Sequence, residues 1–326
     1  MNKFAKWLPC AALFAFAVCV PETAVQAAAY PERPITWVVP YPPGGTTDVV
    51  ARNIAQAVSK ELGGSIVVEN KAGAGGRIAM TYVARAAPDG YTLLVSDASL
   101  ATAPSLYKNM QINPLKDLEA VSLFVTVPHL LVVTPALKVN SLSDLIALTK
   151  KEPGKLNFSS GGIGSPLHLA GEALRLETGL QWTHVPYKGA APAILAAVAG
   201  QAQIATPSLP SALPQVVSGK LHALAVTSPK RVSVLPEVPT VAELGYPKAT
   251  VFGWVGLHAP AGTPADVLKK LEVAVAAAMK DPALIKRLQG QGADIMPESG
   301  SAYGKLVADE AIRWKKVVQA AGLEPE

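Results

Sequence analysis

Short runs rich in apolar and β-branched residues alternate along this chain with stretches that carry an apolar residue every three or four positions. The run at 35–39 ends in prolines and glycines, and apolar residues then recur every four positions from 50 to 62. That spacing gives the expected helix one apolar face. The same order of run, glycine-rich loop and helix recurs after 65–69 and after 156–159. Strands that alternate with helices are typical of an α/β fold with parallel strands.

The pattern predicts two similar units, one in each half of the chain. The expected strands are 35–39, 65–69, 91–95, 156–159, 183–186, 202–205 and 223–227, and the expected helices begin near 47, 78, 165, 190, 263 and 301. Ligands of open α/β sheets bind outside the carboxyl ends of the strands. We therefore expect two lobes whose glycine-rich loops face each other across a cleft.

The first 27 residues have the features of a signal peptide. Lys3 and Lys6 precede an apolar stretch at 8–20, and small residues follow up to Ala27, after which we predict cleavage. The apolar stretch is shorter than the roughly 20 residues that span a membrane. We therefore expect a soluble, exported protein, whose mature chain would start at residue 28 and contain no cysteine.

Composition excludes several classes of protein. Of the 326 residues, 50% are hydrophobic and 16% are charged, so the chain is not of the disordered type. Lysine and arginine exceed aspartate and glutamate by 29 − 24 = 5, without a run of four basic residues, and only 6% of residues are aromatic. A nucleic-acid-binding protein needs a concentrated basic face. We expect no nucleic-acid partner.

Metal and cofactor motifs are incomplete. His168 and Glu172 are four residues apart on one expected helix, but no third ligand lies near them, so we predict no metal site. The loop at 73–76 resembles part of a dinucleotide fingerprint, but Ile78 stands where the third glycine belongs. We therefore predict no cofactor.

A periplasmic hydrolase that uses Ser165 and His168 remains an alternative. These residues fall at the N-cap and third position of the expected helix, where a serine oxygen commonly accepts a backbone N–H instead of attacking a substrate. The segments 44–48 and 161–165 each place small residues before a helix N-terminus, where free N–H groups and the helix dipole favour an anion. Two such loops could hold a small carboxylate without an arginine.

The chain resembles the periplasmic solute receptors of tripartite tricarboxylate transporters, the Bug (Bordetella uptake gene) family. The resemblance covers nearly the whole mature chain. It rests on segments that follow in family order: 39–45 (VPYPPGG) with Asp48, 68–76 (VENKAGAGG), 164–172 (GSPLHLAGE), 184–189 (HVPYKG), 209–214 (LPSALP), 238–243 (VPTVAE) and 256–264 (GLHAPAGTP).

The resemblance implies a two-lobed type II periplasmic binding protein fold with the ligand in a cleft between the lobes. Residues 28–130 and 250–326 would form lobe one, and 131–249 would form lobe two. The implied ligand residues are Tyr41, Gly45, Thr46, Asp48 and Ser99 in lobe one, and Ser160, Gly161, Gly164, Ser165, His168, Tyr187 and Gly189 in lobe two. The ligand would be a carboxylate held largely by backbone groups, hydroxyls and water.

One departure from the family bears on the ligand. Relatives commonly carry Phe-Asp-Asn before the LPSALP segment, whereas this chain has Thr206-Pro207-Ser208. The missing aspartate could have paired with a ligand amine, so this difference favours a ligand without a positive amine.

The sequence thus predicts a non-catalytic periplasmic receptor, monomeric, that captures a small organic carboxylate and delivers it to membrane permease subunits. A ligand-loaded sensory receptor is a second alternative. The sequence leaves open whether the ligand is a dicarboxylate, a tricarboxylate, an aromatic acid or an amide.

Overall fold

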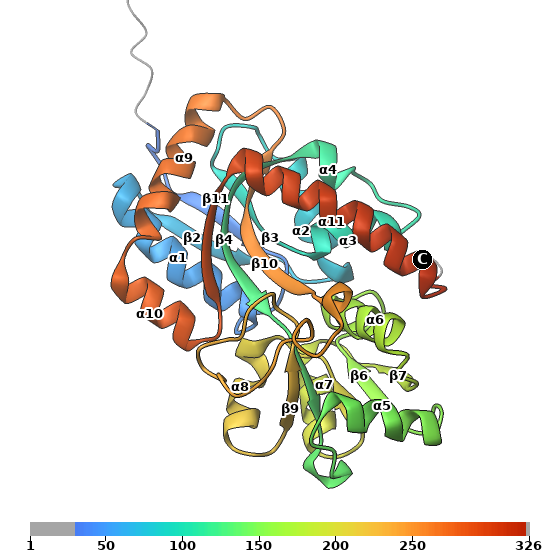
Figure 1. The fold of residues 1–326 in the computed structure, drawn as a ribbon. Coiled ribbons are helices and arrows are strands. Elements are labelled where there is room, and N and C mark those ends of the chain that lie inside the picture. Colours follow the sequence, from blue (N-terminus) through green and yellow to red (C-terminus); the bar gives the residue numbers. More distant parts are fainter. Residues whose placement is uncertain (1–29, 324–326) are drawn as a thin grey trace, which may run out of the picture. The chain divides into compact units, whose positions relative to one another are not determined.

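The computed structural model of the protein describes residues 30–323 (Figure 1). The predicted signal peptide and its cleavage site after Ala27 lie outside these residues. Within the described part of the chain, no helix is both long and apolar enough to cross a membrane.

The first sheet has six strands in the order β11-β4-β10-β3-β1-β2. Its strands are β1 (Ile35–Val39), β2 (Ile66–Asn70), β3 (Thr92–Asp97), β4 (Leu118–Pro128), β10 (Phe252–Pro260) and β11 (Asp294–Ser299). Strand β1 pairs in parallel with β2 and β3, whereas β10 and β11 run antiparallel to their neighbours.

The second sheet has five strands in the order β7-β6-β8-β5-β9. Its strands are β5 (Leu130–Val133), β6 (Asn157–Ser160), β7 (Thr183–Pro186), β8 (Ile204–Ala205) and β9 (His222–Val226). Strand β6 pairs in parallel with β7 and β8, and β5 runs antiparallel to β8 and β9. Both sheets therefore contain the expected parallel pairs, and each also contains antiparallel strands.

Helices cover both faces of the first sheet. Helices α1 (Thr46–Leu62), α9 (Ala265–Ala278) and α10 (Pro282–Gly290) lie on one side, and α2 (Arg77–Ala84), α3 (Ser99–Leu106) and α11 (Gly300–Ala320) lie on the other (Figure 1). The short helix α4 (Pro114–Asp117) precedes β4. Trp37 and Phe124 stack in this core with their ring centroids 5.4 Å apart.

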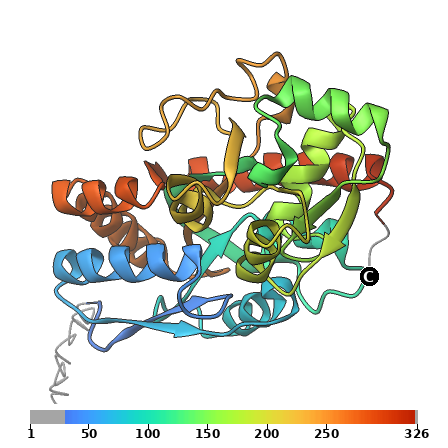
Figure 2. The ribbon, with the colours of Figure 1, turned by 90° about the horizontal axis from the view of Figure 1, so that it is seen from below.

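The second sheet carries its own helices, α5 (Leu142–Lys151), α6 (Pro166–Thr178), α7 (Ala190–Val198) and α8 (Leu209–Val217). In Figure 2, the view from below, the blue helix α1 and the green helix α5 lie on opposite sides. Short 3₁₀ turns occupy Ala74–Gly76, Pro135–Leu137 and Pro247–Ala249.

The chain passes between the two sheets twice, and one residue joins both passages. Thr227 follows β9 and exchanges hydrogen bonds with His129, which connects β4 to β5. The carbonyl oxygen of Thr227 also accepts the N–H of Val251 at 2.9 Å. Val251 is the residue before β10, in which the chain re-enters the first sheet. The two connections are thus held side by side, and they fix which ends of the two sheets face each other.

The contact between α6 and β6 depends on the absence of a side chain at Gly171. A Cβ atom there would overlap the ring of Phe158, which also stacks on Trp182 with ring centroids 4.6 Å apart. We expect Gly171→Ala to lower the free energy of unfolding by about 1–3 kcal/mol, the usual effect of overpacking a core. Urea denaturation measures this change.

The matched control is Gly304→Ala in α11, where an added Cβ would lie 3.6 Å from Ala120, an ordinary contact. Alanine has a higher helix propensity than glycine, so this variant should be as stable as the wild type or more stable by up to about 1 kcal/mol. Equal stability of both variants would contradict the packing argument at Gly171.

Candidate functional site

Polar residues mark the edge of the first sheet where three neighbouring parallel strands end. Asn70 is the last residue of β2, Asp97 is the last residue of β3, and Tyr41 lies two residues beyond β1. Because parallel strands end at the same edge, these three residues come together there, although 56 positions separate Tyr41 from Asp97 in the sequence.

Asp48 holds the loop that leads into α1. Its buried carboxylate accepts hydrogen bonds from the Gly44 N–H, from Arg52 and from the Asn70 amide, which also donates to the Tyr41 carbonyl. Burial acts to raise the pKa of Asp48, but these hydrogen bonds outweigh it and hold the pKa below its usual value. The hydrogen bonds of this carboxylate thus lie within lobe one, where they fix the shape of the glycine loop.

Asp97 accepts a second set of hydrogen bonds at the same edge. Its Oδ1 accepts the N–H of Ser99 at 3.0 Å and the hydroxyl of Ser99 at 2.5 Å, together with the hydroxyl of Tyr41 at 3.3 Å. Its Oδ2 accepts the hydroxyl of Thr47 at 3.4 Å. Burial raises the pKa of Asp97, while the hydrogen bonds act against this shift by stabilising the carboxylate.

The glycine loop of lobe two is held by its own side chains. The Ser160 hydroxyl contacts both the N–H and the carbonyl of Gly162, and it lies 2.7 Å from Nε2 of His184. Gly164 adopts φ +71°, and an added Cβ would lie 2.6 Å from Cδ1 of Leu106 in lobe one. Glycine is therefore required at 164 both by the backbone angle and by the close approach of the other lobe.

His168 supports this loop from behind. It is 2% exposed, its ring stacks on His184 at 3.9 Å, and its Nδ1 accepts the N–H of Gly164 at 3.0 Å. Burial, with a smaller contribution from the charge of Arg175, lowers the pKa of His168 to about 4. The ring is therefore neutral at pH 7, and its unprotonated Nδ1 positions the loop.

Ser165 caps α6. Its hydroxyl accepts the backbone N–H of His168 at 3.2 Å, as expected for a serine at the N-cap. A serine hydrolase requires a hydrogen bond between the serine hydroxyl and a basic side chain. In the part of the chain that the structure describes, Ser165 makes no such bond, because the acceptor nitrogen of His168 is used by Gly164.

Hydroxyl groups join the two lobes beside the cleft. The Thr46 hydroxyl, at the start of α1, lies 3.3 Å from the hydroxyls of both Ser208 and Ser211 at the start of α8. The Thr206 hydroxyl donates to the Leu167 carbonyl in α6. The segment 206–208 therefore contributes hydroxyl contacts to α1 and α6.

A cavity of about 200 Å³ lies between the lobes. None of its lining side chains carries a charge; they are Tyr41, Gly75, Ser99, Thr102, Ala103, Leu106, Tyr107, Gly161, Ile163, Gly164, Ser165 and Pro166. Of the ligand residues expected from the sequence, the cavity brings together Tyr41, Ser99, Gly161, Gly164 and Ser165. The others do not line it; they are Gly45, Thr46, Asp48, Ser160, His168, Tyr187 and Gly189.

Most of the lobe-one lining was not predicted from the sequence. Thr102, Ala103 and Leu106 belong to α3, which was not predicted because its eight residues include Pro104 and lack a clear apolar period. The glycine loop that contains Gly75 was recognised as part of a dinucleotide fingerprint and as a family segment, but Gly75 was not predicted to line the site. Asp97 was missed because its partners are brought to it by the sheet and not by the local sequence.

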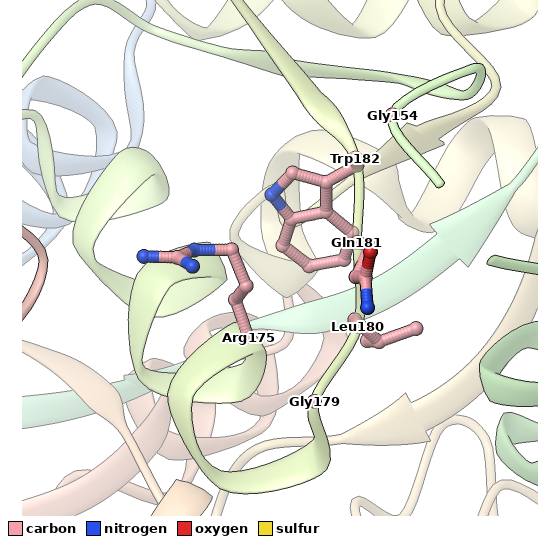
Figure 3. A pocket seen from close by; sticks show the side chains of 6 residues that line it. All are labelled: Gly154, Arg175, Gly179, Leu180, Gln181 and Trp182. Atoms are coloured by element: carbon pink, nitrogen blue, oxygen red, sulfur yellow. The ribbon is translucent and has the colours of Figure 1, made fainter. Parts of the chain in front are cut away.

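A larger and more open hollow, of about 490 Å³, lies on lobe two near the end of α6 (Figure 3). Arg175 and Trp182 border it together with the small residues Gly154 and Gly179. The guanidinium of Arg175 is already paired with Glu172 at 2.7 Å. Residues 30–323 contain no cluster of three histidine, cysteine or acidic side chains that could hold a metal ion.

Comparisons with known proteins agree with this architecture. Residues 50–323 match the family described as tripartite tricarboxylate transporter family receptor. The chain is 40% identical to protein BugT of Bordetella pertussis over 300 residues, which are 91% of this chain and 92% of that protein.

Solved structures match over the same span. A protein from R. palustris, solved with adipate, has a TM-score of 0.85 at 36% identity and covers 91% of this chain and 100% of its own. The periplasmic binding protein BugD has a TM-score of 0.82 at 39% identity, with the same coverage. MatC from Rhodopseudomonas palustris, solved with bound malate, has a TM-score of 0.80 at 36% identity over 89% of this chain and 100% of its own. The prediction of a two-lobed periplasmic binding protein fold is confirmed.

The buried histidines predict how stability depends on pH. Burial lowers the pKa of His129, His168 and His184 to about 4 and that of His258 to about 3. A histidine in the unfolded chain titrates near about 6.5. Below that pH the unfolded chain binds protons that the folded chain does not, so the free energy of unfolding should fall between pH 7 and 5 and change little above pH 7 from this cause.

Urea denaturation at pH 8, 7, 6 and 5 measures this fall. His168→Gln should show a shallower fall than the wild type because one of the buried histidines is removed. His222→Gln, at an exposed position on β9, is the control and should follow the wild-type curve. A His168→Gln curve parallel to that of the wild type would contradict the role of His168.

Proposed function

Because the chain belongs to the tripartite tricarboxylate transporter receptor family, we propose that it captures a small organic carboxylate between its two lobes and delivers it to a membrane transporter. Members of this family are solute-binding receptors, so the prediction of a non-catalytic protein is confirmed. The observation that carries the proposal is the cavity between the lobes, which is lined by glycine loops and helix N-termini.

The cavity suits a small anion held without a basic side chain. The N-terminus of α6 lies at it and presents the positive end of its helix dipole, and the N-termini of α1 and α8 meet each other across the lobes. Among the described residues, the N–H groups of Gly161 and Ile163 donate no hydrogen bond within the protein, and both residues line the cavity. Two relatives with the same fold were solved with carboxylates, adipate and malate.

The size of the cavity limits the ligand. Pockets for drug-sized molecules measure roughly 300–1,000 Å³, and this cavity, at about 200 Å³, is smaller. It favours an acid of a few carbon atoms over an aromatic acid with further substituents.

The proposed ligand residues are those expected from the sequence, in two roles. Tyr41, Ser99, Gly161, Gly164 and Ser165 would contact the ligand, since they line the cavity. The others would hold these contacts in place or reach the ligand as the lobes move; they are Gly45, Thr46, Asp48, Ser160, His168, Tyr187 and Gly189.

The lobe boundaries, 28–130 with 250–326 and 131–249, remain part of the proposal. Sheet membership supports them, because β4 ends at Pro128, β5 begins at Leu130, and β10 starts at Phe252.

We also propose that the protein is exported to the periplasm after cleavage near Ala27 and acts as a monomer. The loaded receptor would dock on membrane permease subunits. Proteins of the same fold that are described as periplasmic support the location.

A thermal-shift screen of the protein purified from the periplasm tests the proposal. The protein is first unfolded and refolded to remove any co-purified ligand, and is then mixed with carboxylates of two to six carbons and with their diamides. A ligand at one hundred times its dissociation constant stabilises the folded state by about 2.7 kcal/mol, which raises the melting temperature by several degrees. We expect shifts with carboxylates and none with diamides; the reverse result would overturn the carboxylate proposal.

Gly45→Val tests whether the loop before α1 contributes to the site. Gly45 has extended backbone angles, and an added Cβ would meet only the Pro42 carbonyl oxygen at 3.7 Å, so valine fits the fold. Its branched side chain would cover the first N–H groups of α1, next to Thr46 and the other lobe. We expect at least about tenfold weaker binding by isothermal titration calorimetry, the loss of roughly one charge-assisted hydrogen bond.

The control for this variant is Gly290→Val at the end of α10, where an added Cβ meets open space. It should bind like the wild type. If Gly45→Val bound equally well, the loop before α1 would have no part in the site.

A further inference from the structure

Asp97 is a buried carboxylate at the cleft without a cationic partner. Its residue is 8% exposed, and among residues 30–323 no lysine, arginine or histidine forms an ion pair with it. By contrast, Asp48 at the same sheet edge is paired with Arg52. The charge of Asp97 is stabilised only by hydrogen bonds from Tyr41, Thr47 and Ser99.

These hydrogen bonds have a fixed direction. An ionised carboxylate can only accept, so each hydroxyl that contacts it must donate its single proton to it. Ser99 gives both its backbone N–H and its hydroxyl proton to Oδ1, and Tyr41 gives its phenolic proton to the same atom. What remains on the Tyr41 and Ser99 oxygens is lone pairs, and both residues line the cavity.

Asp97 also occupies the N-terminus of α3. Its Oδ1 takes the Ser99 N–H, so one of the donors with which this helix could have bound a ligand anion is already used. The lobe-one wall near β3 therefore offers acceptors and a nearby negative charge. The lobe-two wall offers the opposite, namely the unbonded N–H groups of Gly161 and Ile163 beside the start of α6.

We propose that Asp97 makes the lobe-one wall select a ligand with a hydrogen-bond donor, either a hydroxyl or an ammonium group. This donor is in addition to the carboxylate that lobe two holds. This inference rests on the proposed carboxylate-binding function. A bare dicarboxylate would place a second anion against the acceptor oxygens of Tyr41 and Ser99, where it leaves them unsatisfied and is repelled by Asp97. A hydroxyl or ammonium group satisfies them instead.

Asp97 changes the expectation that the ligand has no positive amine. The absence of an aspartate in the segment 206–208 favoured a ligand without an amine. Asp97 supplies an acidic group on the other lobe, so the absence of that aspartate does not disfavour an amine. Hydroxyl and ammonium ligands share the required donor, and the ligand series below distinguishes them.

Isothermal titration calorimetry with matched ligands tests the inference. The two series are succinate, malate and aspartate, and glutarate, 2-hydroxyglutarate and glutamate; within each series one carbon bears hydrogen, hydroxyl or ammonium. A site built around a polar group discriminates strongly against the analogue that lacks its partner. We expect at least one donor-bearing member to bind about tenfold or more tightly than the bare diacid of the same length.

Asp97→Asn is the decisive variant. The substitution removes the charge and frees the hydroxyl protons of Tyr41 and Ser99 to turn towards the cavity. The bare diacid should bind more tightly than it does to the wild type and the donor-bearing acid more weakly, so that their affinity ratio falls to about threefold or less. Asp89→Asn makes the same chemical change at an exposed site in lobe one, where the partner is Arg33, and should keep the wild-type ratio.

The outcomes separate this inference from the proposed function. If carboxylates bind but the wild type shows no preference for a donor, or Asp97→Asn leaves the ratio unchanged, the inference is overturned and the receptor function stands. If no acid binds to the ligand-free protein, the proposed function fails and the inference fails with it. The thermal transition of Asp97→Asn shows whether this variant folds. If it does not fold, the double variant Tyr41→Phe, Ser99→Ala is used instead, because it removes the acceptor oxygens. It must lower the affinity ratio of the donor-bearing acid to the bare diacid in the same way.

Discussion

The paired connections between the two sheets are the constraint on which the site depends. Thr227 binds His129 on the outgoing connection and Val251 on the returning one, so the two strands cross together. This arrangement sets the strand ends of one sheet against those of the other. The helices that follow the parallel strands therefore begin on the side of the cleft.

Two buried aspartates at the same sheet edge have different partners, and this difference separates their effects. Asp48 receives donors from its own loop, from Arg52 and from Asn70, so its charge is neutralised and its effect is to hold the backbone. Asp97 receives only neutral donors, two of which come from side chains that face the cavity. A charge that is not neutralised polarises the groups around it, and here those groups form part of the ligand site.

The sequence predicted the elements whose signals are local. The apolar residues at 50, 54 and 58 are buried on α1, and Ser165 and Pro166 begin α6 as their types require. The strands β4, β5 and β10 were not predicted, because a strand buried on both faces has no alternation to distinguish it. Strand β11 was missed as well, and most of its residues are exposed. Hydrogen-bond partners such as Tyr41 and Asp97 could not be assigned either, since only the sheet order brings them together.

One apolar cluster contributes to the contacts between the lobes on both sides of the cavity, and it bears on how the cavity could open. Near the crossing strands, Leu169 and Ala170 of α6 are fully buried in the same apolar cluster as Trp314 of α11. Across the cavity, Leu106 of α3 belongs to the same cluster and lies against the loop at Gly164, whose neighbour Ile163 is 56% exposed. Opening the cavity on this side would therefore expose part of the shared apolar cluster and cost buried apolar area. A ligand that contacted both lobes would favour the closed arrangement by offsetting that cost.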